Sequence, residues 1–172
     1  MTIAKKLQIG AGNNPLKGYI NQDYKKLKGI DDVFDLNIYP YKYKDNTFDE
    51  VFCEDIIEHL DDTIKSIDEL WRITKDGGII KIYVPHFTHW GTFGDLTHKR
   101  GFSIFAFDLY MQDYYPCKAK FYSIKRSYVI SKNFKFLNIF NPIFNFSKFL
   151  TENFLCKFFL ISRIYVELKV KK

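Results

Sequence analysis

The stretch KLQIGAGNNPLKGYINQD, residues 6–23, constrains the fold more than any other part of the chain. A short apolar run ends in a Gly-Ala-Gly turn at residues 10–12, and a second short run leads to Asp23. This order predicts a strand, a glycine turn and a second strand that ends in a carboxylate. Glycine is favoured where the backbone takes positive φ or passes close to a ligand. A carboxylate at a strand end can accept two hydrogen bonds from a ribose diol, so the pattern predicts a pocket for an adenosine-containing cofactor.

The glycine spacing narrows the choice of cofactor. A dinucleotide-binding turn carries a third glycine three residues after the second, and Pro15 occupies that place. The chain also lacks the Gly-Lys-Ser/Thr sequence of a triphosphate-binding loop. These absences favour a cofactor with an adenosine group and no phosphates, of which S-adenosylmethionine is the obvious one. The alternative is a tight turn between two strands that binds no ligand.

Further motifs follow in order along the chain. They are Asp35-Leu36, DNTFDEV at residues 45–51, IEHL at 57–60, ELWRI at 69–73, KDGG at 75–78 and IKIYVP at 80–85. This series resembles the class I S-adenosylmethionine-dependent methyltransferases, in particular their type 11-like branch, which acts on small acceptors. The resemblance covers about residues 5–110. It implies a Rossmann-like fold, S-adenosyl-L-methionine as cofactor and methyl transfer as the reaction.

The resemblance also implies roles for individual residues. In that family the glycine turn lies against the methionine part of the cofactor, the acid after the second strand holds the ribose, and the acid after the third strand lies near the adenine. The matching residues of this chain are Gly10, Ala11, Gly12, Asp23, Asp35 and Leu36. The family's methyl-transfer site follows the fourth strand, which maps onto Glu54, Asp55 and His59. We assign Glu54 to the cofactor pocket and His59 to the substrate side.

Alternating apolar segments predict an α/β fold. Strands are expected at residues 6–10, 19–22, 32–35, 48–53, 79–84, 120–130 and 163–170, the last of them antiparallel. An amphipathic helix is expected from a cap at Asp61 or Asp62 to the glycine pair at 77–78, and a second helix over 103–114. The result is a Rossmann-like, mostly parallel, seven-stranded sheet flanked by helices. Residues 13–18 are too few for a full helix in the first crossover.

The chain suits a single domain of residues 1–172 that carries an unusual segment. Residues 133–161 form an aromatic and basic insertion before the last strand, with nine of the eighteen phenylalanines of the chain. Lys135, Lys148 and Lys157 are interleaved with them. Three interpretations stay open: a helical insertion packed on the core, a homodimer surface, and a segment that contacts lipid.

Charge is divided unevenly along the chain. Residues 1–100 carry 14 Lys+Arg and 16 Asp+Glu, a net charge of −2, whereas residues 101–172 carry 12 and 4, a net charge of +8. A basic second part is typical of a protein with an anionic partner or of a solvated basic face. The three cysteines are widely spaced and odd in number, which predicts neither a disulfide framework nor a metal pattern. We therefore expect a cytoplasmic protein and leave peripheral membrane contact open.

Two absent motifs bear on the acceptor. No Asn/Asp-Pro-Pro-aromatic sequence follows the fourth strand, as it does in similar enzymes that methylate the amino groups of bases. Cys53 follows Phe52 rather than the proline of a cytosine-carbon methyltransferase, so a buried strand position is expected for it. Nucleic acid is therefore disfavoured. A hydroxyl or carboxyl of a small molecule, sugar or glycan precursor is the preferred acceptor.

Residues 85–102, PHFTHWGTFGDLTHKRGF, hold three of the four histidines. They leave the fifth strand and should overhang the crevice at the carboxyl ends of the parallel strands, where ligands of such sheets bind. The functional hypothesis is an acceptor-side lid with His98 as general base and Asp95 orienting it. His89 is the second candidate for the base, and Arg100 would hold an acidic group of the acceptor.

Two other interpretations of this segment stay open. The side chains can serve only to hold a long loop together by hydrogen bonds. They can also bind a metal through His86, His89, Asp95 and His98; our assignment is that no metal is bound. For the whole chain, the alternative to a methyltransferase is a non-catalytic binding or scaffold protein with the same fold. A nucleotide-binding oxidoreductase is disfavoured by the missing third glycine.

Overall fold

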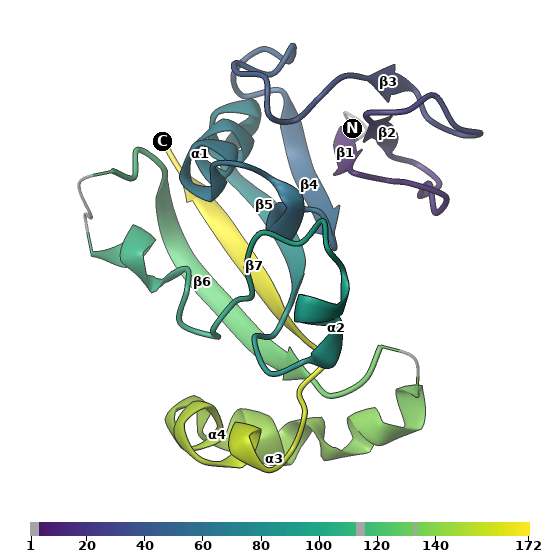
Figure 1. Cartoon of the computed structure of the whole chain (residues 1–172). Coiled ribbons are helices and arrows are strands. Elements are labelled where there is room, and N and C mark those ends of the chain that lie inside the picture. Colours follow the sequence, from purple (N-terminus) through teal and green to yellow (C-terminus); the bar gives the residue numbers. More distant parts are fainter. Residues whose placement is uncertain (1–3, 113–115, 133) are drawn as a thin grey trace.

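The computed structural model describes residues 4–112, 116–132 and 134–172. In these ranges seven strands form one sheet in the order β3-β2-β1-β4-β5-β7-β6 (Figure 1). The strands are β1 (Lys6–Ile9), β2 (Ile20–Asp23), β3 (Asp32–Val33), β4 (Phe48–Glu54), β5 (Thr74–Pro85), β6 (Lys120–Val129) and β7 (Arg163–Lys171). The first five strands pair in parallel, and β7 is antiparallel to both β5 and β6. The predicted sheet, including its antiparallel last strand, is confirmed.

The helices are shorter than the sequence pattern predicts. They are α1 (Thr63–Ile73), α2 (Trp90–Gly94), α3 (Asn141–Phe146) and α4 (Lys148–Asn153), with 3-10 turns η1 (Ile57–His59), η2 (Asp108–Met111), η3 (Lys135–Phe140) and η4 (Leu155–Lys157). Asp62 caps α1 as predicted, accepting a hydrogen bond from the backbone N–H of Lys65 at 2.9 Å. The predicted end at residues 77–78 is wrong, because Thr74 already pairs with Phe48 in the sheet.

The helix predicted over 103–114 is also wrong. The structure has turns at residues 104–107 followed by the short η2, and residues 113 and 114 lie outside the described ranges. Its apolar residues serve the core instead: Ile104, Phe107 and Tyr110 are buried. The apolar spacing of this segment suits a helix, but here it reflects the packing of a loop against the core. Over so short a run, periodicity alone does not distinguish a helix from a packed loop.

The first crossover contains no helix, as predicted. The connection between β1 and β2 is held instead by two buried polar side chains, Gln8 and Asn21. Their side-chain oxygens accept hydrogen bonds from the backbone N–H of Leu16 at 2.8 and 3.0 Å. These bonds satisfy backbone that a helix would otherwise have satisfied internally.

The core lies between the central strands and α1, which packs against β5 (Figure 1). Phe48 and Val51 of β4 and Ile80, Ile82 and Val84 of β5 are fully buried, and α1 contributes Ile67, Leu70 and Ile73. Cys53 is buried in β4, as predicted, and the three cysteines are unpaired. Burial raises the pKa of the Cys53 thiol, which makes this cysteine an inert core residue.

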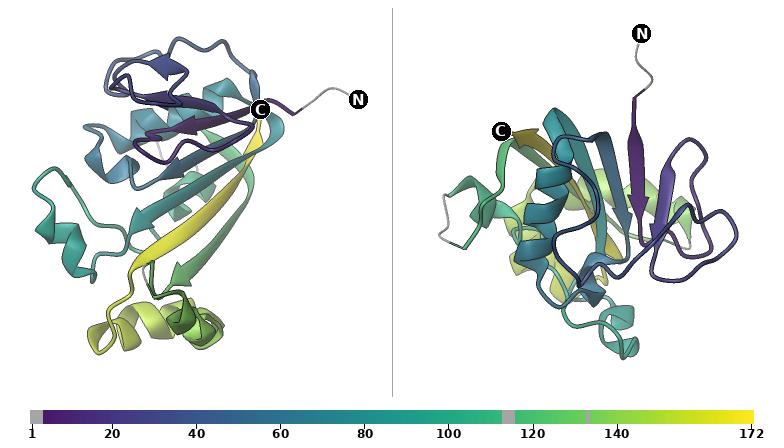
Figure 2. Two further views of the ribbon diagram at one scale, coloured as in Figure 1. Left: turned by 90° about the vertical axis from the view of Figure 1, so that its right-hand side faces the viewer. Right: turned by 90° about the horizontal axis from the view of Figure 1, so that it is seen from above.

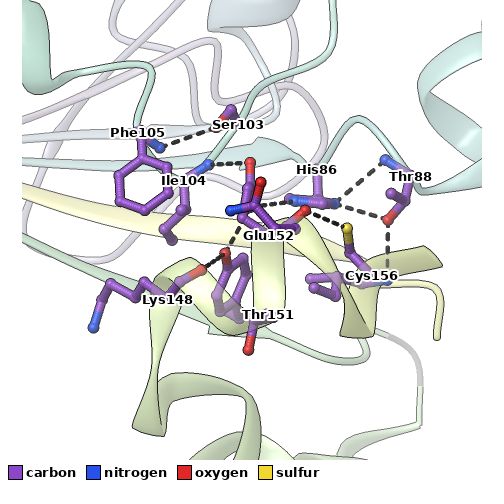
Figure 3. A network of polar contacts seen from close by, with 12 residues as sticks. His86, Thr88, Ser103, Ile104, Phe105, Lys148, Thr151, Glu152 and Cys156 are labelled. Atoms are coloured by element: carbon purple, nitrogen blue, oxygen red, sulfur yellow. Dashed lines mark hydrogen bonds and ion pairs between the residues drawn. The ribbon is translucent and has the colours of Figure 1, made fainter. Parts of the chain in front are cut away.

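The insertion forms a row of short helices, η3, α3, α4 and η4, beyond the end of the sheet where β6 stops and β7 begins (Figures 1 and 2). Glu152 of α4 attaches it to the sheet (Figure 3). The Glu152 carboxylate lies 3.1 Å from Nε2 of His86, accepts from the Tyr128 hydroxyl at 2.6 Å and accepts from the Ile104 N–H at 3.2 Å. Burial alone would raise the pKa of Glu152, but the hydrogen bonds from His86, Ser103 and Tyr128 lower it.

We expect Glu152→Ala to reduce the free energy of unfolding by about 1–3 kcal/mol, because the buried Ile104 N–H would lose its acceptor and the Tyr128 hydroxyl would keep only the Lys148 carbonyl, at 3.2 Å. Urea denaturation followed by circular dichroism measures this. Asn153→Ala, in the same helix, removes only an exposed bond to the Phe149 carbonyl and should change stability by less than about 0.5 kcal/mol. Equal losses in the two variants would contradict the anchoring role of Glu152.

Candidate functional site

Two adjoining cavities lie beyond the carboxyl ends of the parallel strands. The first has a volume of about 540 Å³ and is lined by Gly10, Asp23, Tyr24, Asp35, Leu36, Asn37, Asp55, Ile56, His59, Leu60 and Thr97. The second, of about 280 Å³, is lined by Asp55, Glu58, His59, Pro85, His89, Gly91, Asp95, His98, Lys132, Ser162 and Arg163. Asp55 and His59 belong to both walls. The arrangement can hold two ligands side by side.

The glycine turn and Asp23 form one unit in the first cavity. Gly10 and Gly12 both have positive φ, of 63° and 52°. A Cβ on Gly10 would lie 2.6 Å from a side-chain carbon of Ile56, so no larger residue fits there. The Asp23 carboxylate accepts hydrogen bonds from the N–H groups of Gly12 and Lys25, at 2.8 and 3.1 Å. A carboxylate offers about four lone-pair positions, so two remain for a ligand's hydroxyls.

The residues predicted for the cofactor occupy different places in the structure. Gly10, Asp23, Asp35 and Leu36 line the first cavity. Ala11 and Gly12 belong to the turn but not to the lining, and the Ala11 N–H donates to the Gln22 carbonyl.

Glu54, also predicted to bind the cofactor, lines neither cavity. Its carboxylate pairs with the guanidinium of Arg163 at 2.5 Å. The strand end that carries Glu54 therefore faces β7 rather than the first cavity. Asp55, the next residue, takes the place expected for Glu54, with an unusual φ of 50° that turns the chain at this point.

Several lining residues were not predicted. Tyr24 directly follows Asp23, and Asn37 follows Asp35 by two residues, so their closeness to the predicted acids was a usable signal. Thr97 comes from the lid segment and carried no such signal.

A lid of residues 86–100 closes over the second cavity. His89 caps the start of its α2, and Nδ1 of His89 accepts a hydrogen bond from the Gly91 N–H at 3.2 Å. The Lys99 N–H donates to the Glu58 carbonyl at 2.9 Å, which ties the lid to η1. This backbone bond brings His98 next to Glu58 and His59, although 38 or more residues separate them in sequence.

The hydrogen bonds of His98 fix its tautomer. Nδ1 lies 3.2 Å from the carbonyl oxygen of Thr92, and a carbonyl only accepts, so Nδ1 carries the proton. The lone pair is therefore on Nε2, which lies 3.8 Å from the Asp95 carboxylate and 4.0 Å from that of Glu58. The expected orienting bond from Asp95 is absent at these distances. The Thr92 carbonyl orients the ring instead.

Asp95 and His89 have other partners. The Asp95 carboxylate accepts from the N–H and hydroxyl of Thr97 at 2.8 and 2.7 Å, and these bonds lower its pKa. His89 lines the second cavity, but the Gly91 N–H occupies its Nδ1 lone pair, which leaves the proton on Nε2. Burial lowers the pKa of His89. His98 is thus better placed than His89 to accept a proton.

Glu58 is the residue that the sequence analysis missed. Its side chain is buried, and both carboxylate oxygens lack a hydrogen-bond partner within the described part of the chain. Burial raises the pKa of Glu58 to about 8, and the nearby Asp55 adds to the shift. Glu58 therefore carries a proton at neutral pH. Its place in the IEHL motif was the available signal, but we gave a role only to the neighbouring His59.

His59 links the two cavities. Its ring lies 4.7 Å from the ring of His98, and its Nδ1 lies 2.9 Å from the Thr97 hydroxyl. Burial and the neighbouring His98 lower the pKa of His59. His59 therefore lies on the wall between the two cavities, and its substrate-side role stays a prediction.

The residues that could hold a metal differ from those expected. Among the described residues, Glu58, His59 and His98 each offer a ligand atom within 4.8 Å of the others. His86 of the expected set is fully buried elsewhere, between Glu152 and the Thr88 hydroxyl (Figure 3). The expected four-residue set is therefore not assembled.

Arg100 does not line the second cavity. Its guanidinium donates to the Thr63 hydroxyl and, at 3.0 Å, to the Asp61 carbonyl, at the start of α1. The cations on the cavity wall are instead Lys132 and Arg163, and both contact the Asp55 carboxylate. These two residues come from the ends of β6 and β7, so only the folded chain brings them to the lid.

Comparison with known proteins agrees with this fold. A family model described as a methyltransferase domain matches residues 19–82, which span β2 to β5. No curated protein sequence matches the chain significantly. A SAM-dependent methyltransferase from Archaeoglobus fulgidus is similar in structure, with a TM-score of 0.66 and 17% identity, over 98% of this chain and 86% of that chain.

Two further solved structures show the same fold. One is a SAM-dependent methyltransferase from Thermotoga maritima, with a TM-score of 0.60 and 15% identity, over 99% of this chain and 84% of that chain. The other is a phosphoethanolamine N-methyltransferase from Haemonchus contortus, in complex with phosphomonomethylethanolamine and S-adenosylhomocysteine. Its TM-score is 0.57 and its identity 16%, over 99% of this chain and 49% of that chain.

We expect Asp23→Ala to weaken binding of S-adenosylhomocysteine at least about tenfold, because hydrogen bonds to a charged group contribute about 1.5–3 kcal/mol. Isothermal titration calorimetry measures the dissociation constant. Asp76→Ala is the matched control, because Asp76 is exposed and lies near the start of β5, whereas the cavities lie beyond the carboxyl end of that strand. Unchanged affinity in Asp23→Ala would remove this residue from the cofactor site.

Glu58 gives the stability of the protein a specific pH dependence. Its carboxyl has a pKa of about 8 in the folded chain and about 4.5 when unfolded. The contribution of this pKa difference to the free energy of unfolding is therefore fully present below pH 4.5 and is lost as the pH rises through about 8. We expect Glu58→Gln to gain stability relative to the wild type as the pH rises from 5 to 9, in urea denaturation curves. A stability difference that does not change with pH would contradict the burial of this acid.

Proposed function

We propose that this chain, a class I S-adenosylmethionine-dependent methyltransferase by its methyltransferase-domain match and its fold, methylates a hydroxyl or carboxyl oxygen of a small molecule, sugar or glycan precursor. The enzyme class and the cofactor, S-adenosyl-L-methionine, agree with the resemblance seen in the motifs. The acceptor and the roles of single residues are the proposed part.

The observation that carries the proposal is the shared wall of the two cavities. Methyl transfer is an in-line displacement, so the acceptor atom must lie directly beside the donor. Asp55 and His59 line both the 540 Å³ cavity with the glycine turn and the 280 Å³ cavity with the lid. We place S-adenosyl-L-methionine in the first, held by Gly10, Asp23, Asp35 and Leu36, and the acceptor in the second.

The second cavity suits activation of an oxygen acceptor. When bound, the cofactor supplies a methyl group on a positively charged sulfur. Nε2 of His98 takes the proton that a hydroxyl acceptor loses as its oxygen attacks; a carboxylate acceptor has no proton to lose. Glu58, uncharged at neutral pH, can donate a hydrogen bond that orients the acceptor. Main-chain contacts of the lid hold these groups in place. Alignment of donor and acceptor is the main contribution of an enzyme to this reaction.

Lys132 and Arg163 can bind an acidic group of the acceptor if that group replaces the Asp55 carboxylate, which both cations contact in the structure. Lys132 and Arg163 take the role that Arg100 was expected to play. The volume of the cavity favours a small acceptor or the small end of a larger one. The similar Haemonchus contortus structure holds a small phosphorylated acceptor, and it methylates nitrogen, so amines belong in any acceptor screen. Nucleic acid stays disfavoured because the base-methylation motif is missing.

The alternative is a non-catalytic binding or scaffold protein with this fold. Such a protein would have no use for the Gly10–Ile56 close approach, for Asp23 on the glycine turn or for an unpartnered buried Glu58. A screen of hydroxyl, carboxyl and amine acceptors for release of S-adenosylhomocysteine separates the two. Binding of S-adenosylhomocysteine without turnover of any acceptor would favour the scaffold.

With the acceptor from that screen, we expect His98→Ala to lower kcat by about 10²–10⁴-fold, because a positioned general base contributes a factor of this size. Affinity for S-adenosylhomocysteine should stay within about twofold, since His98 does not line the first cavity. His89→Ala is the matched control from the same lid and should lose less. Unchanged kcat in His98→Ala would exclude it as the base.

Treatment with EDTA tests the other use of the same cluster. We expect turnover to survive it, because His98 acts through a free lone pair in this proposal. Loss of turnover that Mg²⁺, Mn²⁺ or Zn²⁺ restores would instead assign Glu58, His59 and His98 to a metal ion and overturn the general-base role.

A further inference from the structure

Most of the exposed large apolar side chains in the described part of the chain belong to the insertion. Eight of its nine phenylalanines are exposed, among them Phe136 (73% exposed), Phe146 (91%) and Phe158 (81%). We call residues 134–160 the phenylalanine surface. Soluble monomers rarely leave such contiguous apolar area uncovered, so this surface needs a partner.

The exposure belongs to an ordered structure rather than to a loose segment. On the inner side Phe144, Thr151 and Cys156 are buried, and the Thr151 hydroxyl donates to the Phe144 carbonyl at 2.7 Å. Glu152 ties α4 to His86 and Tyr128 (Figure 3). The helices are thus held on the sheet by one side, and the other eight phenylalanines remain exposed.

The charge around the phenylalanine surface is positive. Residues 131–160 contain four lysines and one acid, a net charge of +3. The acid is Glu152, which is taken up in the inner network. Lys148 and Lys157 belong to the helices themselves, whereas Lys132 precedes them and is paired with Asp55. Exposed aromatic rings combined with lysines fit the boundary of an anionic bilayer, where rings enter the acyl region and ammonium groups meet lipid phosphates.

The phenylalanine surface adjoins the acceptor cavity. The two chain segments that enter and leave it supply Lys132, Ser162 and Arg163 to the wall of the second cavity. The lid lies at the same end of the sheet (Figure 2) and carries two more exposed aromatic residues, Trp90 (72% exposed) and Phe93 (77%). In the described residues, no helix is long and apolar enough to cross a membrane. Contact through the phenylalanine surface would place the second cavity beside the lipid.

We infer that the phenylalanine surface binds the face of an anionic lipid bilayer and that the acceptor is an amphiphile whose polar head enters the second cavity. The first part rests on the surface alone. The second part rests on the proposed methyltransferase function. It narrows the acceptor class to molecules with an acidic or hydroxylated head and an apolar anchor.

The test is flotation of the full chain with vesicles of phosphatidylcholine alone and with about 30% phosphatidylglycerol. We expect binding to the anionic vesicles at least tenfold above that to neutral ones, with a loss of binding in high salt. The double variant Phe146→Ser/Phe158→Ser should reduce binding at least tenfold. Met111→Ser/Tyr122→Ser is the matched control, since it removes two exposed apolar side chains outside the phenylalanine surface.

Thermal melting and S-adenosylhomocysteine titration show that both double variants are folded. No binding of the wild type to anionic vesicles overturns the inference. A dimer in light scattering that the Phe146→Ser/Phe158→Ser variant dissociates, with no vesicle binding, assigns the surface to a second copy of the chain instead. Vesicle binding without any heat of S-adenosylhomocysteine binding leaves the lipid surface in place and removes the proposed function.

For the acceptor, turnover should rise at least fivefold when a candidate amphiphile is presented in anionic vesicles rather than as its water-soluble head group. The increase should be lost in Phe146→Ser/Phe158→Ser and kept in the control variant. Equal turnover of the two forms, with vesicle binding intact, would overturn the amphiphile assignment and leave the methyl transfer itself standing.

Discussion

The parallel pairing of β4 with β1 and β5 is the constraint on which the rest of the structure depends. Because these strands run in one direction, the glycine turn, Asp55 and the start of the lid all emerge at one edge of the sheet. Both cavities lie at this edge, and they meet at Asp55 and His59. The shared wall, and with it the proposed transfer between two ligands, follows from strand direction.

A second layer of interactions holds the acceptor side together. The lid is attached to η1 by the bond from the Lys99 N–H to the Glu58 carbonyl, and its first residue, His86, is attached to Glu152 of the insertion. The insertion, the lid and the second cavity thus share their supports. Such a connection suits a protein whose cofactor comes from water and whose acceptor comes from a membrane. The proposed lipid contact at the phenylalanine surface would then be joined by hydrogen bonds to the wall of the second cavity.

The fold and much of the lining of the first cavity could be predicted from the sequence, because they depend on short-range patterns. The strands, the missing first helix, the buried Cys53 and the cavity-lining positions of Gly10, Asp23, Asp35 and Leu36 all follow from residues close together in the chain. The predictions that the geometry did not support concern partners from distant segments. Glu54 pairs with Arg163, Arg100 lies on the start of α1, and Thr92 rather than Asp95 orients His98.

The sequence by itself determined that this chain builds a parallel α/β sheet with a glycine turn and acids at its carboxyl edge, because hydrophobic periodicity and glycine spacing act locally. Only the tertiary structure decided which titratable groups share a cavity. Burial left the Glu58 carboxyl without a hydrogen-bond partner and raised its pKa to about 8. The fold also placed Nε2 of His98 4.0 Å from a carboxylate oxygen of Glu58. Desolvation and hydrogen-bond geometry depend on residues that only the folded chain brings together, so no pattern along the sequence could have specified them.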